Sequence, residues 1–285
     1  MLALDGDLKQ LEILSSSEFE YFRSKIFELA GISMSDSKID LVRTRLRSRI
    51  ISLGFSSFKA YQNYLKDLSE NDPEWQAFIN VMTTNKTDWF REPEHFHFLV
   101  KEFLPKWLSL GKKHLRVWCA ASSTGEEPYT LALVLAEVLQ NTQITFEIIA
   151  SDIDTKVLEV AKNGVYHVDR LYQIPQDYQK SFIAKGTGEI SSWFRLKKDL
   201  KSKVSFKQVN LIASDYPLNS KFDIVFCRNV LIYFDNQTIE NVIQNIYRYC
   251  EEDAVLVIGH SESLQNIKSQ WKYMRPSIYL KGRKF

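Results

Sequence analysis

The pattern of hydrophobic and polar positions changes about a third of the way along the chain. Up to about residue 80, apolar residues recur at the spacing of helices, and no segment alternates as a strand does. Beyond residue 110, short apolar runs that end in small or polar residues alternate with longer amphipathic runs, which is typical of strands connected by helices. The helices expected before residue 111 cover residues 17–30, 37–53, 58–68, 74–82 and 93–110.

The second part of the chain predicts an α/β domain with a doubly wound, mostly parallel sheet. A segment at about 168–203 does not fit this alternation, because aromatic residues alternate with polar ones and Gly186-Thr187-Gly188 marks a hairpin-like turn. We therefore expect a small antiparallel β insertion there, an N-terminal all-helical domain over 1–82, and the α/β domain over 83–285. The core strands expected cover residues 115–119, 144–150, 204–209, 222–227, 254–258 and 273–280, with helices over 126–139, 155–162 and 236–249.

One strand–turn–helix unit carries the clearest chemical signal. An apolar strand from Leu115 runs into a turn of small residues that contains a single glycine, Gly125. Glu126 and Glu127 then open the helix, and the next strand ends near Asp152. Strand, turn, helix, strand and acidic residue form the order of a nucleotide-binding βαβ unit, in which the carboxylate holds ribose hydroxyls.

The turn nevertheless differs from the dinucleotide-binding fingerprint, whose three glycines let the backbone approach a pyrophosphate. Glu126 and Glu127 repel a phosphate but suit a cationic or hydroxyl-bearing ligand. S-adenosylmethionine has a ribose, a sulfonium and an ammonium and no phosphate, so it fits this turn. The residues alone leave a second interpretation open, in which both glutamates only complement the dipole of the helix.

Polar residues follow several of the predicted strands at the point where each strand ends. In a doubly wound sheet the carboxyl ends of the parallel strands form the ligand-binding edge, so agreement among independent strand ends supports a site there. The positions concerned are 122–127, Asp152, Asn210, Arg228-Asn229 and His260-Ser261.

Composition and charge limit the classes of protein and partner. The chain has 285 residues, 45% of them hydrophobic, and a formal net charge of +2, which is ordinary for a globular protein and does not favour nucleic acid. Its three cysteines lie far apart, as expected of buried, reduced thiols in a cytoplasmic protein. No apolar run is long enough for a membrane span, and the five histidines show no ligand spacing, so we expect neither membrane insertion nor a metal. His95 and His97 are expected to be packing or surface residues.

The helix expected over residues 37–53 carries a strong positive charge. Its apolar residues recur at helical spacing, and Asp40 is the only acid between Lys38 and Arg49. A solvated basic face is one interpretation of this helix, and contact with an acidic partner surface is the other. The basic residues are Lys38, Arg43, Arg45, Arg47 and Arg49.

Together these motifs resemble those of the CheR-type chemotaxis methyltransferases, which methylate glutamates of chemoreceptors with S-adenosylmethionine. The matches occur in the family's order and span nearly the whole chain, so the resemblance implies a class I methyltransferase-like, Rossmann-like fold. The matching motifs are Thr84-Asn85-Lys86-Thr87, Phe90-Arg91-Glu92, residues 121–129, Ser151-Asp152-Ile153-Asp154, Val209-Asn210-Leu211, residues 227–234 and Gly259-His260-Ser261-Glu262. One such motif means little, whereas the full set is specific.

The resemblance also implies roles for the matched positions. Arg91 and Tyr233 are the catalytic pair expected nearest the transferred methyl group. Judged from the residues alone, Tyr233 is a buried core residue and Arg91 forms an ion pair with Glu92 or Glu94. The residues that would bind the cofactor are Asn85, Thr87 and Arg91 near its methionine end, Glu127 at its polar groups, Asp152 at the ribose, Asn210 and Leu211 at the adenine, and Arg228 and Asn229 at the pocket floor.

The implied function is methyl transfer from S-adenosylmethionine to glutamate carboxylates of chemoreceptors in the cytoplasm, with S-adenosylhomocysteine as product. The resemblance places the basic helix, Lys38 to Arg49, against the receptor's helical methylation region. Gly186-Thr187-Gly188 matches a turn with which some members dock a receptor tail, whereas Glu189 to Trp193 depart from that pattern. One alternative is a non-catalytic cofactor-binding scaffold, and another is a nicotinamide-dependent oxidoreductase, which the single-glycine turn opposes.

Overall fold

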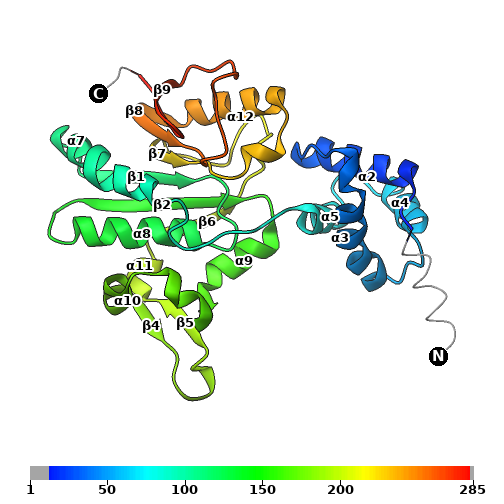
Figure 1. Ribbon diagram of the computed structural model, residues 1–285, viewed down its shortest axis with the longest axis horizontal. Coiled ribbons are helices and arrows are strands. Elements are labelled where there is room, and N and C mark those ends of the chain that lie inside the picture. Colours follow the sequence, from blue (N-terminus) through cyan, green and yellow to red (C-terminus); the bar gives the residue numbers. More distant parts are fainter. Residues whose placement is uncertain (1–12, 283–285) are drawn as a thin grey trace. The chain divides into compact units, whose positions relative to one another are not determined.

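The computed structural model describes residues 13–282 and divides into two compact units. Unit 1 comprises Met1–Thr84 and Tyr233–Thr238, and unit 2 comprises Asn85–Ile232 and Ile239–Phe285. In Figure 1 the labels α2 to α5 mark the helices of unit 1, and the labelled strands belong to unit 2. No helix within the described residues combines the length and hydrophobicity that crossing a membrane requires.

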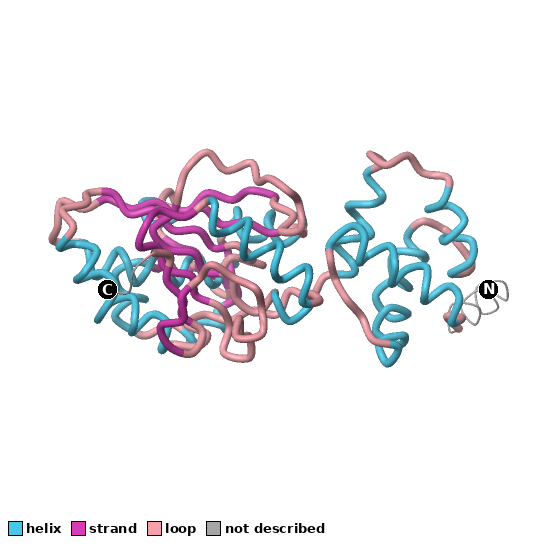
Figure 2. Tube along the Cα trace, turned by 90° about the horizontal axis from the view of Figure 1, so that it is seen from above, coloured by secondary structure: helices cyan, strands magenta, loops and turns pink. Residues whose placement is uncertain are grey.

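Unit 1 is built from helices whose ends follow local sequence signals. Ser15 and Glu18 form a capping box at the start of the first helix, and Gly31, in the left-handed conformation, ends it. Asp72 caps the last helix, with Pro73 at its first position. Figure 2 draws the described part of this unit as helices and loops. The elements are α2 (Ser16–Ala30), η1 (Asp36–Lys38), α3 (Ile39–Ser52), α4 (Phe58–Lys66) and α5 (Pro73–Met82).

The core of unit 1 combines aromatic packing with one buried ion pair. Phe22 is fully buried and stacks on Tyr61. The Tyr61 hydroxyl donates to Glu74 Oε1 over 2.7 Å, and Arg49 Nε donates to the same oxygen over 2.9 Å. Arg45, four positions earlier on α3, donates to the carbonyl of Met82. Arg45 and Arg49 of α3 are therefore engaged by residues outside their own helix, within unit 1.

Unit 2 contains a seven-stranded sheet in the order β6-β2-β1-β7-β8-β10-β9. The first five strands of that order pair in parallel, and β10 and β9 pair antiparallel, which confirms a doubly wound, mostly parallel sheet. The single strand expected over 273–280 is wrong, because the chain turns at Pro276 and Ser277 and forms two strands. The strands are β1 (His114–Cys119), β2 (Thr145–Asp152), β6 (Val204–Gln208), β7 (Phe222–Phe226), β8 (Cys250–Val257), β9 (Lys272–Arg275) and β10 (Ile278–Leu280).

Both faces of this sheet are covered, as the apolar strands predict. Val117 and Cys119 on β1 belong to the core that includes α8. Trp118 between them points to the other face, where it packs against Phe222 and Tyr249. Figure 1 shows α8 and α12 on opposite sides of the sheet. The helices are α6 (Glu94–Phe98), η2 (Leu99–Phe103), α7 (Leu104–Ser109), α8 (Glu126–Leu139), α9 (Thr155–Asn163), α12 (Asn236–Arg248) and the short η5 (Leu231–Tyr233).

The helix expected over 93–110 forms as three consecutive segments, with the π-helical turn η2 in the middle. Pro105 stands at the start of α7 and cannot donate a backbone N–H to the preceding turn. The sequence pattern therefore predicted the length of this element and missed its change of winding.

A small antiparallel sheet, β3-β5-β4, confirms the expected insertion. Its aromatic core is Phe194 and Tyr166, which pack against Trp89 from the chain that precedes the large sheet. The strands β4 and β5 form the hairpin predicted at Gly186, where a Cβ atom would lie 2.0 Å from the Ile190 carbonyl oxygen. The elements are β3 (Val165–His167), η3 (Val168–Gln173), α10 (Gln176–Phe182), β4 (Ile183–Lys185), η4 (Gly188–Ile190), β5 (Trp193–Leu196) and α11 (Lys198–Lys201).

Candidate active site at the carboxyl edge of the sheet

Five parallel strands of unit 2 end at one edge, and polar segments follow them there. The strands β1 and β7 are neighbours in the sheet although β2 and β6 lie between them in sequence, so the strand order reverses at this pair. Such a reversal is where open α/β sheets bind ligands, because the following connections leave toward opposite faces. The polar strand ends predicted from sequence therefore lie along one edge.

The turn between β1 and α8 requires its single glycine. Gly125 has φ +100°, and a Cβ atom there would lie 2.8 Å from the Tyr166 hydroxyl and 3.0 Å from Ala161 Cβ. The backbone N–H of Ser123 in this turn donates to Asp152 Oδ2 over 2.8 Å. The turn and the end of β2 are thus fixed to each other by Asp152.

Asp152 is a buried carboxylate with acceptor capacity left over. Its Oδ1 accepts the Asp154 N–H over 3.0 Å, and its Oδ2 accepts that of Ser123. Burial raises the pKa of Asp152 to about 6, because the backbone N–H donors of Ser123, Ile153 and Asp154 offset only part of the cost of burying its charge. A carboxylate offers about four lone-pair sites, so acceptor capacity remains for a hydroxyl donor.

Asn85 connects the segment before the sheet to both neighbouring loops. Its Nδ2 donates to Asp154 Oδ2 over 2.7 Å, and its carbonyl accepts the Ser123 hydroxyl over 2.8 Å. Asp154 also caps α9 through its other oxygen. The predicted site residues Asn85 and Asp152 therefore share Ser123 as a common partner.

Three charged side chains form a network of ion pairs at the place where the strand order reverses. Arg228, after β7, pairs with Glu127 of α8 over 2.5 Å and with Glu92 over 2.9 Å. Its side chain is 0% exposed, and it also donates to the Arg91 carbonyl over 2.7 Å. The predicted residues Arg91, Glu127 and Arg228 are thereby brought together, with the guanidinium at the centre.

The pKa values of the groups around Arg228 follow from their geometry. Burial lowers the pKa of Arg228, but the charges of Glu127 and Glu92 outweigh burial, and the net pKa is raised. Burial raises the pKa of Glu92, but its bonds to Arg228 outweigh burial, and the net pKa is lowered. Burial also raises the pKa of Cys119 well above its usual value, so the thiol stays protonated and donates to Glu127 Oε1 over 3.1 Å.

The second glutamate of the turn has a different neighbourhood. Glu126 accepts the Thr124 hydroxyl over 2.6 Å and pairs with Arg170 over 3.3 Å. Burial raises the pKa of Glu126. Arg170 belongs to the insertion and also donates to the Thr87 carbonyl over 2.8 Å, so the insertion contacts the site. The sequence pattern identified both glutamates as candidate site residues, whereas no pattern indicated Arg170.

Asn229 adopts a positive φ of 57° that its surroundings support. Its N–H donates to Glu262 Oε2 over 2.9 Å, and its Nδ2 donates to Glu92 Oε1 over 3.3 Å. Gly259 leaves room for this side chain, because a Cβ atom there would lie 2.6 Å from Asn229 Nδ2. The loops after β7 and β8 are thus interlocked around Glu262.

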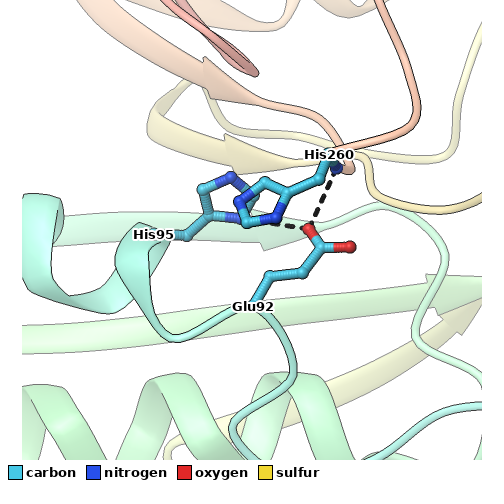
Figure 3. Close-up of side chains that lie close together, drawn as sticks. All are labelled: Glu92, His95 and His260. Carbon is cyan, nitrogen blue, oxygen red and sulfur yellow. Dashed lines mark hydrogen bonds and ion pairs between the residues drawn. The ribbon is translucent and has the colours of Figure 1, made fainter.

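Two histidines meet beside Glu92, as Figure 3 shows. His95 is 2% exposed, and burial together with the charge of Arg228 lowers its pKa to about 3. His260 is exposed, and its backbone N–H donates to Glu92 Oε2 over 3.1 Å. The packing role expected of His95 and the surface position of His97 are confirmed. The histidines show no ligand spacing along the sequence, and His95 and His260 come together with Glu92 only through the fold.

The remaining predicted residues have other surroundings. Arg91 lies in unit 2 with its Nη1 3.3 Å from the Lys86 carbonyl, and Tyr233 lies in unit 1 with its carbonyl accepting the Ser33 N–H. The pairing of Arg91 with Tyr233 therefore stays a prediction. Asn210 and Leu211 follow β6, where Asn210 Oδ1 accepts the Ile212 N–H over 3.3 Å.

Two family models match the chain and together cover most of it. Residues 17–83 match the model described as CheR methyltransferase, all-alpha domain, and residues 85–280 match CheR methyltransferase, SAM binding domain. A chemotaxis protein methyltransferase of Salmonella typhimurium is 38% identical over 93% of this chain and 90% of its own length. Chemotaxis protein methyltransferase 2 of Pseudomonas aeruginosa is 36% identical over 92% of this chain and 92% of its own length. Among solved structures, a glycopeptide N-methyltransferase with bound S-adenosylhomocysteine is similar over 62% of this chain and 50% of its own length. The sequence identity is 14% and the TM-score is 0.35.

Proposed function

Because the chain belongs to the CheR methyltransferase family, we propose that it transfers the methyl group of S-adenosylmethionine to glutamate side chains of chemoreceptors. The products are glutamate methyl esters and S-adenosylhomocysteine, and the reaction takes place in the cytoplasm. S-adenosylmethionine is the cofactor, since the SAM binding domain matches residues 85–280.

The observation that carries this proposal is the presence of two buried carboxylates, Asp152 and Glu127, at the carboxyl edge of the sheet. Asp152 retains acceptor capacity after binding the backbone N–H groups of Ser123, Ile153 and Asp154, which suits a hydroxyl of a ribose. Glu127 stands in the first turn of α8, where its charge disfavours a phosphate and favours an ammonium. A ligand with a ribose, a positive charge and no phosphate fits this set of donors and acceptors.

The reaction does not require a strong general acid or base from the protein. S-adenosylmethionine supplies a methyl group already activated on a sulfonium. A glutamate carboxylate is nucleophilic at neutral pH, so the main tasks of the protein are alignment and the exclusion of water. We assign Arg91 to hold the incoming carboxylate by charge-assisted hydrogen bonds and the Tyr233 hydroxyl to orient it.

We assign receptor contact to one face of α3. Arg45 and Arg49 lie four positions apart and are engaged within unit 1, by Met82 and Glu74. Arg43 and Arg47 share a different face of the same helix, where the side chain of Arg43 is 41% exposed and pairs with Asp40 of the same helix over 3.0 Å. An acidic receptor helix is thus met by Arg43 and Arg47, together with the exposed Lys38 at the start of the helix.

The insertion is the proposed position for a receptor tail. Its β3 and β4 are the edge strands of the small sheet, and an extended peptide adds to such an edge by main-chain hydrogen bonds. Trp193 is 46% exposed and Ile190 is 62% exposed, which offers apolar contact to the same peptide.

The test is incubation with radiolabelled S-adenosylmethionine and the cytoplasmic fragment of a cognate receptor. We expect label in the receptor that is released as methanol by mild base, and loss of this label in Arg91→Ala. Receptor binding without base-labile label would favour a non-catalytic scaffold. Binding of NADH in place of S-adenosylhomocysteine would favour an oxidoreductase.

A further inference from the structure

We propose that Glu92, His95 and His260 form a binding site for a divalent transition-metal ion of the zinc class. One ligand atom from each of the three residues lies within 4.8 Å of the others. Figure 3 shows both imidazole rings beside the Glu92 carboxylate, with His95 on a helix and His260 on a loop from another part of the sheet. The site lies next to the cofactor-binding residues and uses none of those assigned to the cofactor.

His95 is the residue that most clearly requires a ligand. It is 2% exposed, and neither of its ring nitrogens has a hydrogen-bond partner among residues 13–282. Its Nδ1 lies 3.5 Å from Glu92 Oε2, which is longer than an ordinary hydrogen bond. A buried polar group without a partner is costly, and a metal ion would provide the missing interaction.

The geometry requires only a modest movement of one residue. Zinc–nitrogen and zinc–oxygen bonds of about 2.0–2.2 Å place tetrahedral ligand atoms about 3.3 Å apart. Glu92 and His95 already approach this separation, and the rings of His95 and His260 have centroids 4.7 Å apart. His260 is exposed on the loop after β8, so rotation of its side chain can close the set. Two histidines and one glutamate are a known zinc ligand set that leaves a fourth position for water.

The charges nearby set the consequence of metal binding. Glu92 Oε2 is also the partner of Arg228, so a metal ion competes with this guanidinium for one oxygen. Glu92 Oε1 also lies 3.9 Å from Arg91 Nε, so the ion competes with this second guanidinium for the Glu92 carboxylate. A bound ion draws Glu92 from Arg228, and Arg228 is left with Glu127 and the Arg91 carbonyl. We therefore expect the ion to inhibit methyl transfer, a consequence that rests on the proposed function, whereas metal binding itself does not.

The test is titration of the chelator-treated full-length protein with ZnCl2, followed by calorimetry, and with CoCl2, followed by visible absorption. We expect one equivalent of each metal, with the absorption of tetrahedral cobalt. His260→Ala should weaken binding by more than about tenfold, as loss of a ligand costs at least as much as loss of a residue that supports one.

A matched control is available in His97, which pairs with Glu94 over 3.6 Å on an exposed surface. His97→Ala should bind both metals as the unmodified protein does. The proposal is overturned if no stoichiometric binding occurs, if His260→Ala binds like the unmodified protein, or if His97→Ala loses affinity equally. Because His260 is exposed, its replacement should leave the fold intact, and the test does not require a variant of the buried His95.

Discussion

The guanidinium of Arg228 and the carboxylate of Glu127 form a 2.5 Å ion pair between segments that are 101 residues apart in sequence. The side chain of Arg228 is 0% exposed and that of Glu127 is 10% exposed, so water screens this pair little. The pair fixes the first turn of α8 to the loop after β7, which are the two segments on either side of the strand-order reversal. Arg228 therefore positions Glu127, and its place at the floor of the cofactor pocket stays a prediction.

Replacing Arg228 should damage folding and cofactor binding together. Arg228→Met leaves Glu127 and Glu92 buried without their counter-ion, which typically costs about 3–5 kcal/mol of unfolding free energy. Urea denaturation measures this loss, and calorimetry with S-adenosylhomocysteine measures the affinity. Arg195→Met, at an exposed position of β5, is the control and should change neither quantity appreciably. A stable Arg228→Met variant with full affinity would contradict the positioning role.

Cofactor affinity should depend on pH through Asp152, whose pKa is about 6. Ribose hydroxyls donate to the ionised carboxylate, so affinity should be full above pH 6 and fall by up to about tenfold per pH unit below it. Calorimetry with S-adenosylhomocysteine between pH 5 and 8 measures the change. Asp152→Asn cannot titrate, so its weaker binding should vary less over this range. An equal slope in both proteins would assign the pH dependence to another group.

The stability of the cofactor-free protein should show the opposite trend. The folded-state pKa of Asp152 is about 6 and lies above its ordinary value of 3.8, so between these values the folded protein binds a proton more readily than the unfolded chain does. Lowering the pH through 6 should therefore stabilise the unmodified protein relative to Asp152→Asn. Urea denaturation at pH 5 and pH 7 measures the difference, and a sign reversal would show that the folded-state pKa is not raised.

Gly125→Ala should cost more than an alanine at another glycine that has a positive φ. A positive φ alone costs a residue with a side chain about 1–2 kcal/mol. At Gly125 the new Cβ atom would also lie 2.8 Å from the Tyr166 hydroxyl and 3.0 Å from Ala161, whereas Gly188, at φ +59°, has nothing within 4 Å. Gly188→Ala is thus the control for backbone strain. Thermal unfolding and S-adenosylhomocysteine affinity should both fall further in Gly125→Ala, and equal losses would show that the turn yields to the added atom.

The parts of the fold that local patterns encode could be predicted from the sequence. Alternation of apolar runs and turn residues located the parallel strands, and the polar residues after them located the edge, because strand ends in a parallel sheet meet there. The helix over 93–110 and the strand over 273–280 were predicted too simply, since Pro105 and Pro276 change the backbone within an otherwise continuous apolar pattern.

The pairings within the site could not be predicted, because they join residues distant in sequence. Asn85 bonds to Asp154 across 69 positions, and His260 bonds to Glu92 across 168. Nothing in the spacing of Glu92, His95 and His260 indicates that they meet, since their proximity depends on the order and register of the strands between them. The pairing of Arg228 with Glu92 and Glu127 could not be predicted for the same reason.

Receptor recognition by α3 should depend on which face of the helix is changed. Arg47→Glu removes a base from the face shared with Arg43, so it should raise the KM for receptor methylation about tenfold or more, because like charges then face each other across the interface. Arg49→Gln removes the partner of the buried Glu74 and should instead lower stability by about 3–5 kcal/mol. Methylation assays at several salt concentrations, alongside urea denaturation, separate the two effects. S-adenosylhomocysteine affinity should be unchanged in Arg47→Glu, and an unchanged KM for this variant would exclude the Arg43–Arg47 face as the receptor contact.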